Sequence, residues 1–366
     1  MPFRCPVTFR CPVTFRSRAW TYLFLTPALV LSAALASSAE DSGCAAAGAP
    51  GKAIATESYH IPSDTPGIEL FVRNKRPAGA SAFAPSRILL YVHGATYPSE
   101  TAFDLRLGGF SWMDYIACRG FDVYLVDLRG YGQSTRPSEM EHPAPENPPI
   151  VTTAIAVRDV STTVDHVLAR RRVDKIDLLG WSWGTSIMAG YTAQNPTKVN
   201  RLVLYAPIWI FKTPPLIGGG GQLGAYRTVT KEAARKRWYT GVPEAKQTEL
   251  VPPGWFEAWA EATWATDPTS AQTGQLRAPN GVLQDLRDYW AAGKPYYDPA
   301  SITVPVFIAH AEWDADLPTY MPLTLFSLLA NAPVKRMVEI GEGTHTVIME
   351  KNRIQLFREV QTFLEE

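Results

Sequence analysis

The feature that most constrains the fold is a serine between two glycines, where a strand-like run meets a helix-like one. Residues 175–180 are mostly apolar, the sequence Gly-Trp-Ser-Trp-Gly occupies residues 180–184, and the stretch to residue 194 is helix-forming. A sharp strand-to-helix turn of this kind exposes the serine hydroxyl above a sheet and needs small residues on both sides. Ser182 is therefore the candidate nucleophile.

Apolar strand-like runs alternate with helical segments along most of the chain. We expect strands at residues 53–59, 67–73, 87–92, 122–127, 175–180, 201–205, 304–310 and 336–340. We expect helices near residues 110–118, 153–170, 183–194, 320–329 and 348–364. This alternation predicts an α/β fold, with a mostly parallel central sheet and helices on both faces.

The alternation is interrupted at residues 209–300, which are helical in pattern and rich in tryptophan. Ligands of open α/β sheets bind at the carboxyl ends of the strands. We therefore interpret this segment as an inserted helical cap over those ends. Residues 53–208 and 301–366 would together form the α/β core.

The first 39 residues have the parts of an export signal. Residues 1–18 carry four arginines and no acid, residues 19–36 are apolar, and small residues follow. The pattern predicts a secretory signal peptide cleaved after Ala39, or after Ala36 as second choice. The mature protein would then be secreted or periplasmic, without stable membrane association. An uncleaved membrane anchor is the alternative, and Pro27 within the apolar run favours cleavage.

Residues 40–52 are small and polar and predict a flexible leader. Two cysteines, Cys44 and Cys118, remain after cleavage. Export would permit a disulfide between them, and two free thiols are the alternative. A lipid anchor on Cys44 is disfavoured because the preceding residues 41–43 are not apolar. The chain has 35 basic and 35 acidic residues, which argues against nucleic acid as a partner. The sequence leaves the oligomeric state open.

A serine hydroxyl is a weak nucleophile and needs a general base, which in turn needs an acid to fix its tautomer. His345 lies in a glycine-rich loop after the last predicted strand, and Asp314 follows the strand before it. Asp316 and Glu312 are the competing carboxylates. The tetrahedral oxyanion needs two backbone N–H donors, which we assign to Trp183 and Ala95.

In their order along the chain, these residues resemble the α/β-hydrolase superfamily over residues 53–366. The resemblance rests on His93-Gly94-Ala95, the loop at residues 127–134, the glycine-flanked serine, Asp314 and His345. It implies the α/β-hydrolase fold and a Ser-His-Asp triad, with Asp127 and Arg129 as loop-fixing residues. It leaves the substrate open, because this fold hosts many reactions.

Trp183 directly after the nucleophile is similar to epoxide hydrolases and haloalkane dehalogenases, but those enzymes need an aspartate nucleophile. Hydrolysis of carboxylic esters, lactones included, is therefore the favoured reaction. The alternative is a proline iminopeptidase-like peptidase, which would bind a substrate ammonium with cap carboxylates. The candidates for that role are Glu232, Glu244, Glu249, Glu257 and Glu261. A catalytically silent binding protein is disfavoured because every triad residue is present.

The chain has eleven tryptophans, many of them in the predicted cap. Aromatic walls suit an apolar or aromatic small-molecule ester. We expect two to four of these side chains to contact substrate, and the others to form the cap's own core. The candidates are Trp181, Trp183, Trp209 and Trp313. The sequence implies no cofactor and no metal, and the glycine run at residues 218–221 lacks the Gly-Lys-Ser/Thr of a phosphate loop.

Overall fold

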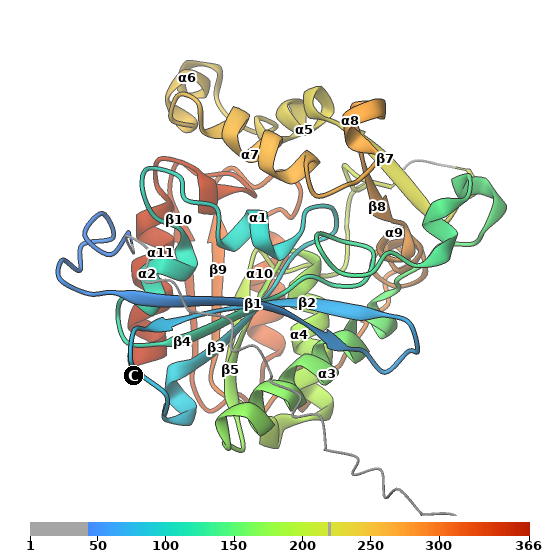
Figure 1. The fold of residues 1–366 in the computed structure, drawn as a ribbon. Coiled ribbons are helices and arrows are strands. Elements are labelled where there is room, and N and C mark those ends of the chain that lie inside the picture. The colour runs from blue at the N-terminus through green and yellow to red at the C-terminus, as the bar shows by residue number, and fades with distance from the viewer. Residues whose placement is uncertain (1–42, 219–220) are drawn as a thin grey trace, which may run out of the picture. The chain divides into compact units, whose positions relative to one another are not determined.

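The computed structural model describes residues 43–218 and 221–366, so the predicted signal peptide at residues 1–39 lies outside the described residues. In the described chain, eight strands form one sheet in the order β1-β2-β4-β3-β5-β6-β9-β10 (Figure 1). The strands are β1 (Ile54–Pro62), β2 (Glu69–Pro77), β3 (Ile88–Val92), β4 (Asp122–Val126), β5 (Ile176–Trp181), β6 (Val199–Tyr205), β9 (Val306–Ala311) and β10 (Lys335–Ile340).

The sheet is mostly parallel. Strand β2 pairs antiparallel with both β1 and β4, whereas all neighbours from β4 to β10 pair in parallel. Every residue of β3, β4 and β5 is buried, as expected for parallel strands covered on both faces. The predicted α/β class is thereby confirmed, and the continuous apolar runs of the sequence have their physical reason.

Helices cover both faces of the sheet (Figure 1). On one face, Trp112 stacks on Phe357 with ring centroids 4.7 Å apart, which joins α2 to α11. Helices α3, α4 and α10 lie on the opposite face. The single-turn helix α1 follows β3 and was not predicted. The bounds are α1 (Ser99–Phe103), α2 (Trp112–Ala117), α3 (Thr153–Arg171), α4 (Trp183–Gln194), α10 (Tyr320–Leu328) and α11 (Arg353–Glu365).

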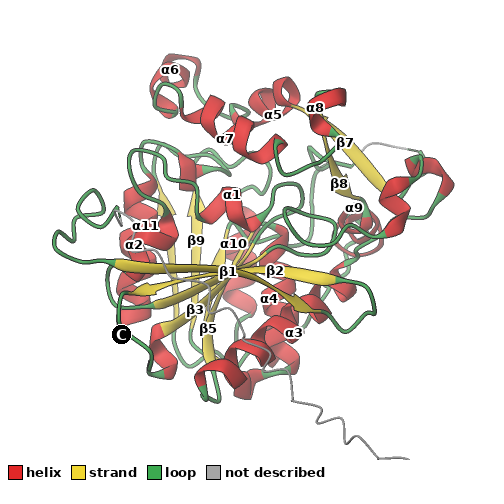
Figure 2. Cartoon of the chain, viewed as in Figure 1, coloured by secondary structure: helices red, strands yellow, loops and turns green. Residues whose placement is uncertain are grey.

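The segment inserted between β6 and β9 contains helices and also a two-stranded antiparallel sheet, which the helical prediction missed (Figure 2). The strands β7 and β8 are short and only half-buried, so their sequences lack the continuous apolar runs of the central sheet. The elements are β7 (Tyr226–Thr230), α5 (Lys231–Trp238), α6 (Gln247–Leu250), α7 (Trp255–Trp264), α8 (Ser270–Thr273), β8 (Gln275–Pro279) and α9 (Gly281–Asp285), which continues as a π-helical turn at Leu286–Trp290.

The segment before β1 is attached to the core. Cys44 and Cys118 form a disulfide with their Cα atoms 5.6 Å apart, and the Cys44 side chain is buried. Arg119 also donates a hydrogen bond from Nη2 to the carbonyl of Ala47 at 3.0 Å. The described part of the expected flexible leader is therefore a series of turns cross-linked to the end of α2. No helix among the described residues is long and apolar enough to cross a membrane.

Candidate active site

Ser182 sits at a strained turn between β5 and α4. Its backbone has φ 56° and ψ −120°, a combination that costs energy for any residue with a Cβ. The turn is sharp enough that a Cβ on Gly180 would lie 2.2 Å from the carbonyl oxygen of Gly184. A Cβ on Gly184 would in turn lie 2.6 Å from the carbonyl oxygen of His93. Both flanking glycines are thus needed to present the Ser182 hydroxyl.

His345 and Asp314 form a hydrogen-bonded pair at the carboxyl ends of β10 and β9. Nδ1 of His345 lies 2.8 Å from Oδ2 of Asp314, and the backbone N–H of Leu317 donates to Oδ1 of Asp314 at 2.9 Å. Burial alone would lower the pKa of His345, but the Asp314 carboxylate outweighs it and raises that pKa. With its proton on Nδ1 held by Asp314, the imidazole leaves Nε2 free to accept a proton.

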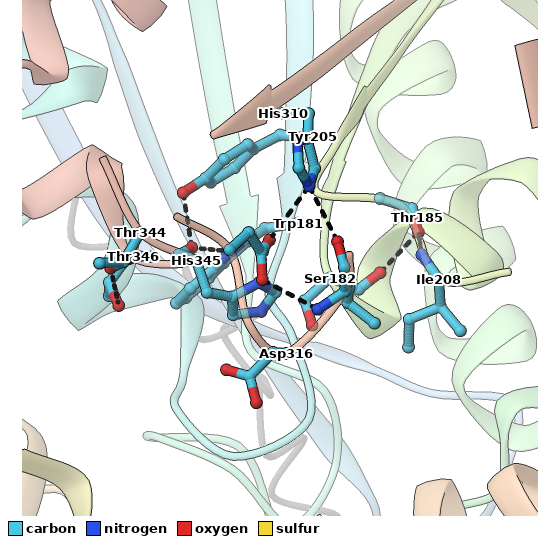
Figure 3. Close-up of polar contacts among 12 residues, drawn as sticks. Trp181, Ser182, Thr185, Tyr205, Ile208, His310, Asp316, Thr344, His345 and Thr346 are labelled. Carbon is cyan, nitrogen blue, oxygen red and sulfur yellow. Dashed lines mark hydrogen bonds and ion pairs between the residues drawn. The ribbon is translucent and has the colours of Figure 1, made fainter. Parts of the chain in front are cut away.

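Asp316, the competing carboxylate, has a different partner. Nε of Arg237 on α5 donates to both carboxylate oxygens of Asp316, at 2.9 and 3.1 Å. Burial would raise the pKa of Asp316, but Arg237 and His345 hold it below its ordinary value. Asp314, Asp316 and His345 have ligand-type atoms within 4.8 Å of one another (Figure 3 shows Asp316 and His345). A metal ion there would have to replace the hydrogen bonds that Arg237 and His345 already make.

The predicted oxyanion donors, Ala95 and Trp183, flank Ser182. Neither N–H donates to another described residue, since Trp183 is the first residue of α4 and Ala95 follows the end of β3. A Cβ on Gly94 would lie 3.0 Å from Cβ of Ser182, so glycine permits this loop to approach Ser182. The two N–H groups are available for a ligand oxygen beside Ser182.

His93 holds the peptide group that carries the Ala95 N–H. Its Nε2 accepts the backbone N–H of Leu128 at 3.2 Å, so the proton is on Nδ1, which donates to the carbonyl oxygen of Gly94 at 2.7 Å. That carbonyl and the Ala95 N–H belong to the same peptide group. Burial lowers the pKa of His93 to about 4, so the ring is neutral near pH 7 and keeps this tautomer.

A pocket of about 490 Å³, partly open to solvent, lies between this centre and the cap. Ser182 and His345 line it, and cap residues from α5 and α7 form its other walls. We call it the inner pocket. A second chamber also borders Ser182 and has apolar walls that include Phe211, Leu286 and Trp290. The inner pocket is lined by Gly94, Ala95, Thr96, Tyr97, Trp181, Ser182, Ala234, Arg237, Trp238, Trp259, Asp316, His345 and Thr346.

Of the four tryptophans expected to contact substrate, only Trp181 lines the inner pocket. The Trp183 side chain is fully buried in the core and donates from Nε1 to Oγ1 of Thr153 at 2.8 Å. Trp209 packs edge-on against Tyr297, and Trp313 is half-buried outside both chambers. These three expectations are corrected, because none of the three side chains lines either chamber. For Trp183 and Trp313, a position next to a candidate catalytic residue in sequence does not set the direction of the side chain.

The cap aromatics that do line the inner pocket are Trp238 and Trp259, which pack edge-on with ring centroids 5.0 Å apart. Glu350 joins Trp238 to the His345 loop. Its carboxylate accepts the indole N–H of Trp238 at 2.7 Å and the backbone N–H of Thr344 at 3.0 Å. Glu350 thereby couples the position of α5 to the loop that carries His345.

The five cap glutamates considered for ammonium binding are all exposed on the outer surface, and none lines the inner pocket or the second chamber. Sequence reasoning instead missed Arg237 and Tyr97, which do line the inner pocket. Arg237 lies within a run of basic residues at 235–237 that reads as a solvated helix face, so no sequence signal distinguished it.

Comparison with known proteins places this chain among hydrolases. The chain matches the model of the alpha/beta hydrolase family over residues 89–359. No curated protein sequence matches it significantly. Solved structures that resemble it include a thermophilic esterase from Thermogutta terrifontis (malate bound), at 16% identity and a TM-score of 0.54, covering 84% of this chain and 98% of that one.

Two further structures have the same fold at lower identity. A serine hydrolase from the polyaromatic hydrocarbon-degrading bacterium Cycloclasticus zankles is 14% identical, with a TM-score of 0.56. The match covers 85% of this chain and 98% of that chain. Est816, described as an N-acyl homoserine lactone degrading enzyme, is 13% identical, with a TM-score of 0.54. The match covers 83% of this chain and 100% of that chain. At such identities the likeness is one of fold.

Proposed function

The chain belongs to the alpha/beta hydrolase family, and we propose that it is an exported serine hydrolase that cleaves carboxylic esters, lactones included, of apolar or aromatic substrates. One observation carries the proposal. Ser182, at its strained turn, lines the same pocket as His345, whose Nδ1 is 2.8 Å from the Asp314 carboxylate. A nucleophile, a base and an orienting acid thus meet where a substrate has access.

In the first step the Ser182 hydroxyl attacks the ester carbonyl carbon while Nε2 of His345 takes its proton. Asp314 stabilises the imidazolium that forms. The carbonyl oxygen becomes an oxyanion, which accepts hydrogen bonds from the N–H groups of Ala95 and Trp183. When the tetrahedral intermediate collapses, His345 returns the proton to the departing alcohol oxygen, and the acyl group remains on Ser182.

In the second step water attacks the acyl carbon and gives its proton to His345. The same two N–H groups hold the second oxyanion, and collapse releases the carboxylic acid and restores the Ser182 hydroxyl. With a lactone the alcohol and the acid are parts of one molecule, so the product is a single hydroxy acid. Every step uses groups of this chain and water.

The lining of the pocket supports apolar or aromatic substrates. Tyr97, Trp181, Trp238 and Trp259 wall the inner pocket, and the second chamber beside Ser182 has mainly apolar walls. A peptidase that binds a substrate ammonium would need carboxylates aimed into the pocket. Asp316 is the one acid that lines it among the described residues, and Arg237 already pairs with it. The esterase reaction is therefore preferred.

Export is part of the proposal. The composition of residues 1–39 motivates it, and the Cys44–Cys118 disulfide is consistent with an oxidising compartment, where such bonds persist. Mass spectrometry of the protein recovered from the native host's culture medium or periplasm tests this. A mature N-terminus at residue 40 or 37 supports export, and an intact residue 1 in the cytoplasm contradicts it.

The activity is tested with the purified mature protein and its Ser182→Ala variant. The substrates are p-nitrophenyl acyl esters of increasing chain length, an aromatic ester and a prolyl p-nitroanilide. We expect ester cleavage by the wild type and a loss of about 10⁴-fold or more in kcat for Ser182→Ala. Ser327→Ala, an exposed serine on α10, is the matched control and should keep full activity.

The outcomes separate the alternatives. Cleavage of the anilide alone would contradict the esterase function and support a peptidase instead. Equal rates across the ester series would contradict the apolar and aromatic specificity. If no substrate is cleaved, a fluorophosphonate probe decides: a covalent adduct on the wild type but not on Ser182→Ala identifies an active serine hydrolase with another substrate, and no adduct contradicts the proposal.

A further inference from the structure

We propose that Arg237 forms a carboxylate-binding subsite beside Ser182, so that the esters this enzyme prefers carry a free carboxylate group. The inference rests on the proposed esterase function and deepens it by naming a substrate class. It concerns a cap residue outside the triad and the oxyanion donors.

The first step is the placement of Arg237. It lies on α5, and its side chain borders both the inner pocket and the second chamber, the two spaces that reach Ser182. The side chain is about a quarter exposed, at 26%. Arg235 on the same helix lines neither space, is 47% exposed and pairs with Glu257.

The second step is the use of the guanidinium. Only Nε donates to Asp316, at 2.9 and 3.1 Å to its two oxygens. The two terminal nitrogens of Arg237 have no hydrogen-bond partner in residues 43–218 and 221–366. A guanidinium is a planar fork whose edges can each hold a carboxylate. Asp316 occupies one edge and so fixes the orientation of the group, while the terminal nitrogens remain available to a ligand.

The third step is the charge around the pocket. A third chamber, bordered by Arg237 and Thr96, is lined also by Arg227 of β7. Arg227 has only uncharged partners among the described residues. It donates to the carbonyl of Ala95 at 2.5 Å, to Oγ1 of Thr96 at 2.8 Å and to the carbonyl of Pro279 at 2.6 Å. Among the residues that the structure describes, two arginines and one acid, Asp316, therefore line the three chambers, which leaves an excess of positive charge.

The combination specifies a ligand. Walls of tyrosine and tryptophan favour an apolar body, and a half-buried guanidinium with free donors favours an anionic end. A neutral ester would leave the terminal nitrogens of Arg237 without partners once substrate has displaced water from the pocket, which costs binding energy. An ester with a free carboxylate would satisfy them.

The test compares two esters of nearly equal shape. Mono-p-nitrophenyl glutarate carries a free carboxylate on its acyl chain, and p-nitrophenyl glutaramate carries a neutral amide in its place. For the wild type we expect kcat/KM to be at least tenfold higher for the anionic ester, with the ratio falling as salt is added. Arg237→Met should bring the ratio below one, because Asp316 is then left as an unpaired negative charge.

Three further variants make the result specific. Arg237→Lys keeps the charge without the fork and should give an intermediate ratio. Arg237→Met combined with Asp316→Asn should give a ratio near one, since neither charge remains. Arg235→Met, on the outer face of the same helix, should keep the wild-type ratio. Because each readout is a ratio within one protein, partial misfolding of a variant does not mimic the effect.

The wild type alone can overturn the proposal. If its kcat/KM is the same for the neutral and the anionic ester, or if Arg237→Met and Arg235→Met change the ratio equally, Arg237 has no role in recognising a carboxylate. The esterase function would then stand without this subsite. If the wild type cleaves neither ester and takes no fluorophosphonate adduct, the esterase proposal fails, and the subsite that rests on it fails as well.

Discussion

Loss of the Cys44–Cys118 bond should destabilise the protein strongly without touching the active site. The bond joins residues 74 positions apart. In the chain-entropy model, closing a loop of this length removes about 15 cal/mol/K from the unfolded state, or about 4.5 kcal/mol at 25 °C. The unfolding entropy is ~2.1 cal/mol/K per residue, or roughly 700 cal/mol/K for the folded part of a chain this long, so Tm should fall by about 6 °C.

The assay compares thermal and urea unfolding of the oxidised protein, the protein reduced with dithiothreitol, and a Cys44→Ala/Cys118→Ala variant. Reduction removes the cross-link without removing side-chain atoms, whereas the double variant also removes two buried sulfurs and should unfold slightly earlier still. The urea m-value should increase, because an unfolded chain without the cross-link exposes more surface. Dithiothreitol should not shift the unfolding midpoints of the double variant, which serves as the control.

Two results would refute this reasoning. Equal midpoints for the oxidised and reduced wild type would show that the cross-link does not restrict the unfolded state as calculated. A loss of esterase activity at 25 °C on reduction would show that the bond supports the catalytic centre, which it does not contact. We expect unchanged kcat under reducing conditions at that temperature.

Three further outcomes are expected. His93→Phe should lower kcat by about 10- to 100-fold with little change in KM, since the Ala95 N–H loses its fixed orientation. An unchanged kcat with a raised KM would contradict this. The acid limb of kcat/KM should have its midpoint above 6.5, because His345 must be neutral to act and its pKa is raised; Asp316→Asn should move that midpoint to lower pH. Burial raises the pKa of Asp177 and of Glu350 to about 7, above their unfolded values, so their contribution to stability is complete below about pH 4 and is lost as pH rises through 7. The free energy of unfolding from urea titrations should therefore fall from pH 5 to pH 8, by at most about 3 kcal/mol for Asp177 of β5. A pH-independent difference between wild type and Asp177→Asn would contradict that assignment.

Much of the fold could be predicted from local patterns. The strands β3 and β5 are buried at every position, so their sequences are mainly apolar runs that could be recognised as strands. The short strands β7 and β8 are partly exposed and carry no such run, so the cap was predicted as wholly helical. The sequence did not decide between a disulfide and two free thiols, because the distance between Cys44 and Cys118 depends on the tertiary fold.

The residues of the candidate site divide in the same way. Ser182, Asp314 and His345 each follow the end of a parallel strand, and strands of this kind bring their carboxyl ends to one edge of the sheet. The need for glycine at Gly180 is equally local, because a Cβ there would collide with Gly184 in the turn itself. Glycine at Gly184 has a tertiary reason, because a Cβ there would collide with the carbonyl oxygen of His93 after β3. Such positions can be named from sequence once the strands are recognised.

Which side chains face the substrate was decided only by the tertiary structure. Trp183 follows Ser182 in sequence, yet the direction of α4 turns its indole into the core toward Thr153. Arg237 lies far from Ser182 in the chain, and the packing of α5 over the sheet brings it to the same pocket. Periodicity and motifs report what each segment does by itself, so the sequence alone determined the sheet and the candidates for the nucleophile, the base and the acid. The pocket is built from surfaces of separate segments, whose relative placement depends on packing energies that no single segment contains.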